Sequence, residues 1–173
     1  MYKELITIVV PVKENPNIVS EFISGNSEIL NNCNVIIIDT NGGKELKKYG
    51  IYLKKECSMI LARKIGLSLV KTPFILNLDI DNVLPKGYLD SALLLLMNNK
   101  NVAVVAIDYE KCLGHYGYGT SLWQTEILRK LYDYEPLKEG LCECLYMWRQ
   151  VLRGHFEIEN LPYRAIHLKV TKK

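Results

Sequence analysis

A pair of aspartates stands at the end of an apolar segment of the sequence. Asp79 and Asp81 directly follow the residues Phe74–Leu78. Side chains two residues apart on a strand point the same way, so the two carboxylates would share one small space. Such a pair repels itself unless a cation or a proton intervenes, and Mg²⁺ or Mn²⁺ bound by carboxylates and a substrate diphosphate is a common arrangement. A structural interpretation is also open, in which Asp81 and Asn82 cap a helix that begins at Pro85.

Short strand-like runs alternate along the chain with helical patterns. The strand-like runs are Ile6–Val10, Val35–Ile38, Phe74–Leu78 and Val102–Ile107, and the apolar helical positions between them are Ile18/Phe22, Leu61/Ile65/Leu69 and Leu89/Leu93/Leu96. This βαβαβαβ order predicts an α/β fold with a mostly parallel central sheet and helices on both faces. Ligands of open α/β sheets bind beyond the carboxyl ends of the strands. This sequence places three polar segments there, Lys13–Asn15, Asp39–Gly43 and Asp79–Asn82.

The second half of the chain has a different character. Gly114–Gly119 is rich in glycine and tyrosine, which predicts a loop. After it, apolar residues at i, i+4, i+7 and i+11 predict one buried stripe of a helix that Gly154 ends. These residues are Leu141, Leu145, Trp148 and Leu152, and another face of the helix carries Glu143, Tyr146 and Gln150.

Composition limits the classes of protein that the chain could belong to. Its 173 residues are 49% hydrophobic and 24% charged, which is typical of one globular domain. The net charge of +3 is too small to indicate nucleic acid binding. No apolar run approaches the roughly 20 residues of a transmembrane segment, and the first strand-like run ends in Pro11-Val12-Lys13 rather than at a signal-peptide cleavage site. Five scattered cysteines indicate neither a disulfide framework nor a zinc site. We therefore expect a cytoplasmic protein.

The aspartate pair fits the motifs of two enzyme families. Leu78–Val83 resembles the strand-Asp-x-Asp-x-Thr/Val motif of haloacid-dehalogenase-like phosphatases, in which Asp79 would be the nucleophile. That family also requires an acidic metal-binding cluster after a later strand. The only acidic residue directly after Val102–Ile107 is Asp108, followed by Tyr109 and Glu110. The phosphatase is therefore kept as the alternative.

The second resemblance covers nearly the whole chain in the right order. Four motifs resemble the family-2 glycosyltransferases of GT-A fold, and they are Ile6–Asn15, Val35–Asp39, Ala62–Leu67 and Phe74–Asp81. Beyond the loop, Glu143 with Arg149, Gly154 and Leu161–His167 resemble that family's acidic-residue helix, glycine turn and closing strand. The resemblance implies a single GT-A, Rossmann-like domain over residues 1–173. Residues 1–110 would bind the nucleotide sugar and metal, and residues 111–173 would supply the acceptor loop, catalytic helix and closing strand.

The resemblance implies a nucleotide-diphospho-sugar donor bound by Pro11, Asp39, Arg63 and Asp79. Asp39 would accept a hydrogen bond from the base, although a turn or helix cap is the structural alternative. Arg63 would lie by the base or the diphosphate, with a solvated helix position as its alternative. Asp81 would be the main ligand of Mg²⁺ or Mn²⁺, with Asp79 and His167 as further ligands.

The resemblance also implies an acceptor and a catalytic base. Glu143 aligns with the general base of an inverting displacement, and the acceptor would be a hydroxyl of a glycan, lipid, protein or small molecule. Tyr116, Tyr118 and Trp123 are acceptor candidates because aromatic faces stack on sugar rings, although Trp123 could equally be a packing residue. A non-catalytic relative that binds sugar nucleotides stays open, as does assembly into a homo-oligomer.

Overall fold

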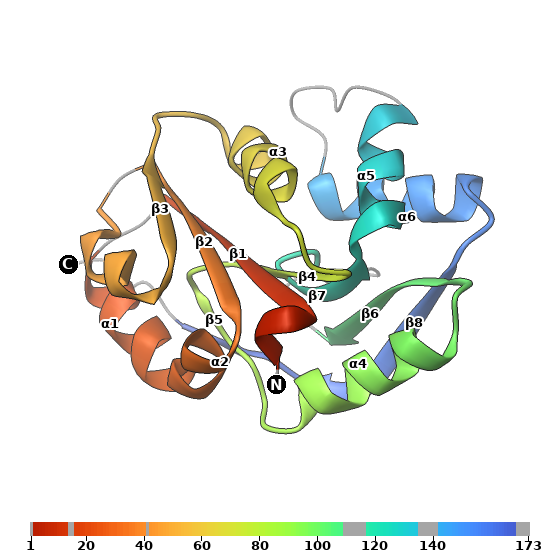
Figure 1. Cartoon of the computed structure of the whole chain (residues 1–173), viewed down its shortest axis with the longest axis horizontal. Helices are drawn as coiled ribbons and strands as arrows, with labels where there is room; N and C mark the ends of the chain where they lie inside the picture. Colours follow the sequence, from red (N-terminus) through yellow and green to blue (C-terminus); the bar gives the residue numbers. More distant parts are fainter. Residues whose placement is uncertain (1, 14–15, 41, 109–116, 135–141, 169–173) are drawn as a thin grey trace.

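A seven-stranded sheet forms the centre of the molecule (Figure 1). The computed structural model describes residues 2–13, 16–40, 42–108, 117–134 and 142–168. The strands are β1 (Ile6–Val12), β2 (Asn34–Asp39), β3 (Ile51–Lys54), β4 (Phe74–Leu78), β5 (Asn82–Val83), β6 (Val102–Asp108), β7 (Thr120–Gln124), β8 (Glu157–Arg164) and β9 (Ile166–His167). The helices are α1 (Pro16–Gly25), α2 (Ser27–Asn32), α3 (Met59–Leu69), α4 (Tyr88–Asn98), α5 (Thr125–Tyr134) and α6 (Glu143–Arg153), with the 3₁₀ turns η1 (Tyr2–Glu4) and η2 (Lys44–Tyr49).

The central sheet has the strand order β3-β2-β1-β4-β7-β6-β8. All neighbouring strands are parallel except β7, which is antiparallel to both β4 and β6. The sheet is therefore mostly parallel, as the sequence predicts, and its four predicted strands correspond to β1, β2, β4 and β6. The parallel register brings the ends of β1, β2 and β3 together, because Val12 lies opposite Asp39 and Asp39 lies opposite Lys54.

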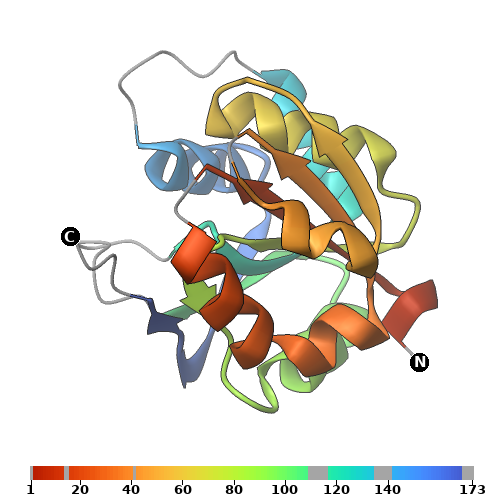
Figure 2. The ribbon, with the colours of Figure 1, turned by 90° about the vertical axis from the view of Figure 1, so that its left-hand side faces the viewer.

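Helices cover both faces of the sheet, which confirms the predicted layering. Two views at right angles show α3, α5 and α6 on one side and α1, α2 and α4 on the other (Figures 1 and 2). The buried side chains divide in the same way. One core packs Phe22 and Tyr88 against Ile8 and its neighbours, and the other packs Trp123 and Met147 against the opposite face.

The α6 helix is rotated relative to the stripe that the sequence predicts. Leu145 is partly exposed and Leu152 is 66% exposed, whereas Met147 and Val151 are fully buried. Leu141 lies outside the described residues. Trp148 is buried as predicted, but the prediction is wrong for Leu145 and Leu152, because α6 packs on α5 and β8 through the side that carries Met147 and Val151. Glu143 precedes these two residues by four and eight positions, so it lies on the inward side of the helix. Gly154 ends α6, as predicted.

The α3 helix also turns an unexpected side inward. Leu61 and Leu69, two of its predicted apolar positions, are exposed, and the buried residues are Ala62, Arg63, Gly66 and Leu67. Gly66 permits close packing on the sheet, since a Cβ there would lie 2.4 Å from Val9 Cγ1. The close approach of this helix carries the Arg63 side chain into the protein.

The strand β9 lies beside the aspartate pair. The predicted closing strand is two strands, because β8 ends at Arg164 and β9 pairs antiparallel with β5 after Ala165. This pairing sets His167 opposite Asn82, next to Asp81. The residue before α4 is Gly87 in a left-handed conformation (φ 79°). The proposed helix cap by Asp81 and Asn82 is therefore wrong.

Two further sequence expectations can be compared with the described residues. None of the helices in this part of the chain is both long and apolar enough to span a membrane. No disulfide links the four cysteines that the structure describes, Cys33, Cys57, Cys142 and Cys144.

Candidate functional site

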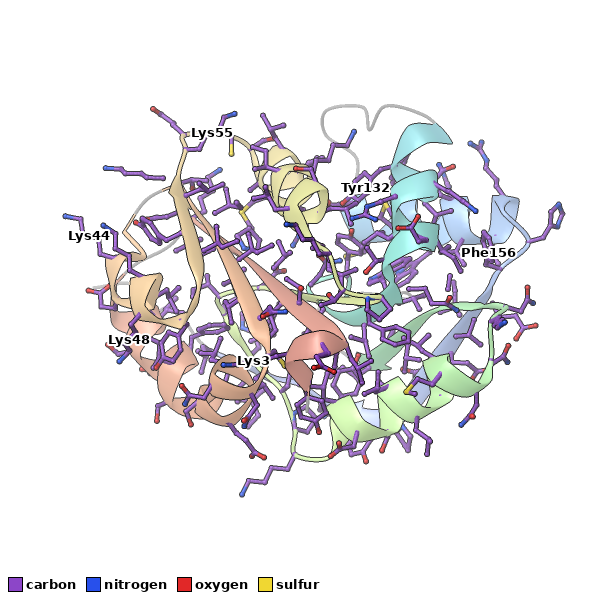
Figure 3. The ribbon with its side chains drawn as sticks, viewed as in Figure 1. Lys3, Lys44, Lys48, Lys55, Tyr132 and Phe156 are labelled. Carbon is purple, nitrogen blue, oxygen red and sulfur yellow. The ribbon has the colours of Figure 1, made fainter. Side chains whose placement is uncertain are left out.

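A cleft of about 950 Å³ opens at the carboxyl ends of β1, β2 and β3. Its walls carry several lysines and hydroxyls around one buried carboxylate, and its lining residues are Lys13, Asp39, Thr40, Gly42, Lys44, Lys54, Glu56, Cys57 and Ser58. Lys44 and Lys55 project outward on this side of the molecule (Figure 3). A basic rim of this kind would attract an anionic ligand.

Asp39 lies at the end of β2 and is almost completely buried. Its Oδ2 accepts a hydrogen bond from the Tyr52 hydroxyl. Its Oδ1 is also buried, and no described residue donates a hydrogen bond to it. Gly43, not Asp39, precedes η2, so the helix-cap alternative is wrong. A buried carboxylate oxygen without a donor is costly and is suited to accept an N–H from a ligand.

Arg63 connects two carboxylates that are far apart in the sequence. Its guanidinium group donates from Nη2 to Asp79 Oδ1 and from Nη1 to Glu143 Oε2. The Arg63 side chain is only 7% exposed, so the alternative of a solvated helix position is wrong. Burial lowers the pKa of Arg63, but the Asp79 and Glu143 carboxylates raise it more, so the net direction is upward. The guanidinium group therefore remains charged and holds both carboxylates in place.

Two tyrosines complete this network on the side of α5 and β7. The Tyr132 hydroxyl lies 3.2 Å from Glu143 Oε1, to which it donates, and 2.8 Å from the Tyr118 hydroxyl. The Arg63 guanidinium carbon lies 5.0 Å from the centre of the Tyr118 ring, within the range of a cation–π contact. Figure 3 shows Tyr132 between α5 and α3. The position of Glu143 is thus fixed by its hydrogen bonds with Arg63 and Tyr132 and by its place in α6.

Glu143 has the properties of a carboxylate prepared to accept a proton. Its side chain is 11% exposed. Burial raises the pKa of Glu143, Arg63 lowers it, and Asp79 raises it, with an upward net direction. A carboxylate with a raised pKa is a stronger base than an ordinary glutamate, which is the property that general base catalysis requires.

Asp79 and Asp81 follow the carboxyl end of β4. Asp79 is 26% exposed, with its Oδ1 bound by Arg63, and its backbone N–H donates to the Gly119 carbonyl at 2.9 Å. Asp81 is 30% exposed, and its Oδ2 lies 2.9 Å from His167 Nε2. Burial raises the pKa of Asp81, Asp79 raises it further, and His167 lowers it, with an upward net direction. The structure thus brings the aspartate pair and His167 together.

The described residues can be compared with the needs of a divalent cation. No three of their His, Cys, Asp and Glu side chains converge as a complete ligand set. Arg63 binds Asp79 Oδ1, and Asp81 and His167 form an adjacent pair. Mg²⁺ typically binds to one or two carboxylates and takes its other ligands from water and substrate phosphates. Asp81 and His167 therefore fit a cation that arrives with a diphosphate.

The remaining predicted site residues lie in different environments. Pro11 is buried within β1 opposite Ile38 and is not among the residues that line the cleft. Arg63 does not line the cleft either, and it lies instead between Asp79 and Glu143. Tyr116 lies outside the described residues. Tyr118 is buried beneath Arg63 and so holds the guanidinium group rather than presenting a face to an acceptor.

Trp123 is a packing residue, which corrects its prediction as an acceptor contact. It is 0% exposed and stacks on Trp148 at 5.4 Å with an interplanar angle of 8°. Its indole N–H donates to Ser121 Oγ at 2.7 Å. A side chain with both its faces and its polar atom satisfied inside the protein has no surface to offer a sugar.

Sequence reasoning missed two residues of the site. Tyr52 lies on β3, which is short and mostly exposed and therefore lacks the apolar pattern of the other parallel strands. Tyr132 lies on α5, where Ile127, Leu128 and Leu131 form a buried helical pattern that could have revealed the helix. Neither tyrosine has a neighbour in sequence that marks it as functional.

Comparisons with known proteins point to one enzyme fold. No known family profile matches the sequence, and no curated protein sequence matches it. The mannosyltransferase PcManGT from Pyrobaculum calidifontis, solved in complex with GDP-Man and Mn²⁺, has a TM-score of 0.76 and 12% identity, over 94% of this chain and 57% of that chain. The structure of S. aureus TarS 1-349 has a TM-score of 0.73 and 15% identity, over 95% of this chain and 60% of that chain. This chain spans about three fifths of the length of these two structures. At these identities the likeness is one of fold, and the chain has the GT-A glycosyltransferase fold that its motifs predicted.

Proposed function

We propose that the protein transfers a sugar from a nucleotide-diphospho-sugar donor to an acceptor hydroxyl. The observation that carries the proposal is the buried Arg63, which holds Asp79 at the end of β4 and Glu143 on α6 in one network. Asp79 belongs to the donor-facing edge of the sheet, and Glu143 has the raised pKa of a base. The proposal assigns donor binding to Asp79 and proton acceptance to Glu143, the two carboxylates that Arg63 binds.

The reaction assigned to these groups is a single displacement. The acceptor oxygen forms a bond to the anomeric carbon while the bond from that carbon to the phosphate oxygen breaks. The electron pair leaves with the nucleoside diphosphate, and the acceptor proton passes to Glu143. One attack from the opposite side inverts the anomeric configuration. Arg63 keeps Glu143 oriented and keeps positive charge beside Asp79, where the anionic donor would lie.

Asp81 and His167 would hold the divalent cation, as Mg²⁺ or Mn²⁺. When bound, the cation supplies positive charge that stabilises the departing diphosphate. The 2.9 Å contact between Asp81 and His167 supports this assignment because it fixes the carboxylate at the edge of the sheet. The Mn²⁺ in the PcManGT structure is consistent with it. The donor contacts of Pro11, Asp39 and Asp79 and a cytoplasmic location remain part of the proposal.

The phosphatase alternative has less support. Its nucleophile would be Asp79, but Arg63 binds one oxygen of that carboxylate, and the fold resembles glycosyltransferases. The alternative of a non-catalytic relative differs only in the absence of turnover. The buried network around Glu143 favours catalysis, because an uncharged residue would satisfy a purely structural position at lower cost.

Calorimetric titration with UDP-glucose and GDP-mannose, with and without Mn²⁺, tests the proposal. We expect at least one donor to bind, and to bind more tightly with Mn²⁺. In Asp81→Asn the increase in donor affinity that Mn²⁺ causes should fall by about tenfold or more, because a carboxylate ligand of the cation is lost. Asp90→Asn is the matched control, because this carboxylate lies in the first turn of α4 and accepts a hydrogen bond from Tyr2. It should retain the increase in donor affinity that Mn²⁺ causes. Binding without any metal response would contradict the metal site, and absence of donor binding would contradict the function.

Gly119→Ala is expected to impair transfer through Asp79. A Cβ at Gly119 would lie 1.8 Å from Asp79 Oδ2, so the carboxylate must move and its contact with Arg63 must change. Displacements of about 1 Å near reacting groups cost on the order of 10²-fold in rate. Gly66→Ala is the control for overpacking alone, since its Cβ would lie 2.4 Å from Val9 Cγ1. Both variants should melt at lower temperature. Sugar transfer at the wild-type rate by folded Gly119→Ala would show that the reaction does not require the Asp79 carboxylate in its present position.

A further inference from the structure

The two carboxylate oxygens of Asp39 have different surroundings at the floor of the cleft. Oδ2 accepts the hydrogen bond from the Tyr52 hydroxyl. Oδ1 is buried, and no described residue donates to it. Asp39 is 1% exposed, so bulk water does not compensate for the missing donor. The cleft therefore offers a ligand one acceptor oxygen, Asp39 Oδ1, rather than both oxygens of the carboxylate.

Tyr52 is fixed in its position on Oδ2. It lies on β3 opposite Ile37, and the Lys47 ammonium lies 4.9 Å from the centre of its ring. Burial and the hydrogen bond to Asp39 raise the pKa of Tyr52 to about 12. The hydroxyl thus stays protonated at neutral pH and donates its hydrogen bond to Asp39 Oδ2. A ligand cannot use both oxygens of Asp39 without competing with Tyr52.

Nucleobases differ in the number of donors that they present side by side. Guanine carries a ring N–H and an adjacent amino group, which pair best with both oxygens of one carboxylate, in the fork-to-fork geometry of bidentate contacts. Uracil and thymine carry a single ring N–H between two carbonyl oxygens. A single acceptor flanked by donors matches this imide edge, and a single acceptor leaves one donor of guanine without a partner.

The flanks of Asp39 carry the donors that the imide edge needs. Lys54 lies opposite Asp39 in the sheet register, and Lys13 follows Val12, the partner of Asp39 on β1. Both lysines line the cleft, and an ammonium group donates but cannot accept. Lys13, Lys54 and the second carboxylate of the cleft, Glu56, are all exposed, so water competes for their hydrogen bonds. The buried Oδ1 of Asp39 therefore contributes most to the choice of base.

We infer that the cleft selects a donor whose base is a pyrimidine imide, uracil or thymine, and that Tyr52 disfavours guanine by occupying Asp39 Oδ2. The inference rests on the proposed function, because it assumes that the cleft binds the base of a nucleotide sugar. It also separates this chain from PcManGT, whose structure contains GDP-Man. Tyr52 is then a specificity residue.

The test is calorimetric binding of UDP, dTDP, CDP and GDP to the wild-type protein in Mn²⁺. UDP and dTDP should bind at least tenfold more tightly than GDP or CDP, since an unsatisfied buried donor or acceptor costs about that factor. In Tyr52→Phe the preference for UDP over GDP should narrow by about tenfold, because Oδ2 becomes available. Tyr49→Phe is the control, since Tyr49 lines a separate pocket at the other end of the strands, and it should keep the wild-type preference.

The outcomes separate the inference from the function on which it rests. Equal or tighter binding of GDP by the wild-type protein would overturn the inference while leaving a nucleotide site in place. An unchanged preference in folded Tyr52→Phe would remove Tyr52 as the specificity residue and overturn its assigned role. Absence of binding by all four nucleotides would overturn the proposed function and the inference together. The wild-type ranking remains decisive even if the Tyr52 variant does not fold.

Discussion

Glu143→Gln is expected to lower the rate of sugar transfer by roughly 10²–10⁴-fold, the range of general base catalysis. Glutamine keeps the shape of the side chain, and its amide oxygen can still accept a hydrogen bond from Arg63, but it cannot take a proton from the acceptor. Donor binding should stay within about twofold of the wild-type value, because the cleft around Asp39 does not include Glu143. Steady-state transfer and donor titration on the same preparation would measure both effects.

A matched carboxylate distinguishes loss of the base from a general charge effect. Glu126→Gln, in the first turn of α5, removes an exposed carboxylate that pairs with the nearby Arg129. This variant should transfer sugar at the wild-type rate. Equal activity of Glu143→Gln and the wild-type protein would assign the proton to another group.

The pH dependence of sugar transfer is a second test of Glu143 as the general base. The groups that face it are Arg63 from α3, Tyr132 from α5, Tyr118 before β7 and Asp79 after β4. Because the net pKa of Glu143 is raised, the base is ionised only above a pH higher than the ordinary glutamate range near 4.3. Transfer should therefore fall as the pH drops through that raised pKa, and this acid limb should be absent from the residual activity of Glu143→Gln.

Arg63→Met is expected to destabilise the protein by about 3–5 kcal/mol at neutral pH, the cost of removing one partner from a buried ion pair. Methionine fills part of the space but leaves the Glu143 carboxylate buried without its cation, next to Asp79. Denaturant unfolding would measure the loss. Arg149→Met, on the exposed side of α6, is the control and should change the unfolding free energy by less than about 0.5 kcal/mol.

The destabilisation of Arg63→Met should depend on pH in a definite direction. Removal of the arginine takes away the one nearby charge that lowers the pKa of Glu143, so the folded-state pKa rises further above its unfolded value. A group of this kind favours folding when protonated, and that contribution is lost as pH rises through the folded pKa. The deficit relative to wild type should thus be smaller near pH 5 than near pH 8. A deficit that is constant across this range would place the cost in lost packing rather than in charge.

The sequence predicted the parts of the fold that strong apolar patterns encode. The strands β1, β2, β4 and β6 are continuous runs of mostly buried residues, and few other secondary structures fit such runs. The weaker strands β3 and β7 were not predicted. Their residues are exposed in β3 and mixed in character in β7, and their pairing depends on neighbours distant in sequence.

The site was predicted by residue type, but its connections were not. Asp81 and His167 were expected to meet, and they do. Arg63 was expected near the base or diphosphate, yet it holds Asp79 and Glu143, because close packing at Gly66 turns that side of α3 inward. The stripe Leu145 and Leu152 suggested the wrong side of α6, since the helix buries polar Glu143 and Gln150 instead. Apolar periodicity fails at Glu143 because a buried polar residue there is paired with Arg63 from another helix.

The most direct test of the account follows UDP-glucose by proton NMR in Mn²⁺, with a high concentration of protein and no added acceptor, so that water takes the place of the hydroxyl. UDP-glucose is the probe because it combines the proposed base with a defined anomeric configuration. The account predicts slow release of UDP and free glucose in equal amounts, with the β-anomer appearing first from the α-linked donor, and almost none with Glu143→Gln. Release of inorganic phosphate, first appearance of the α-anomer, or no turnover by a protein that binds the donor would contradict it.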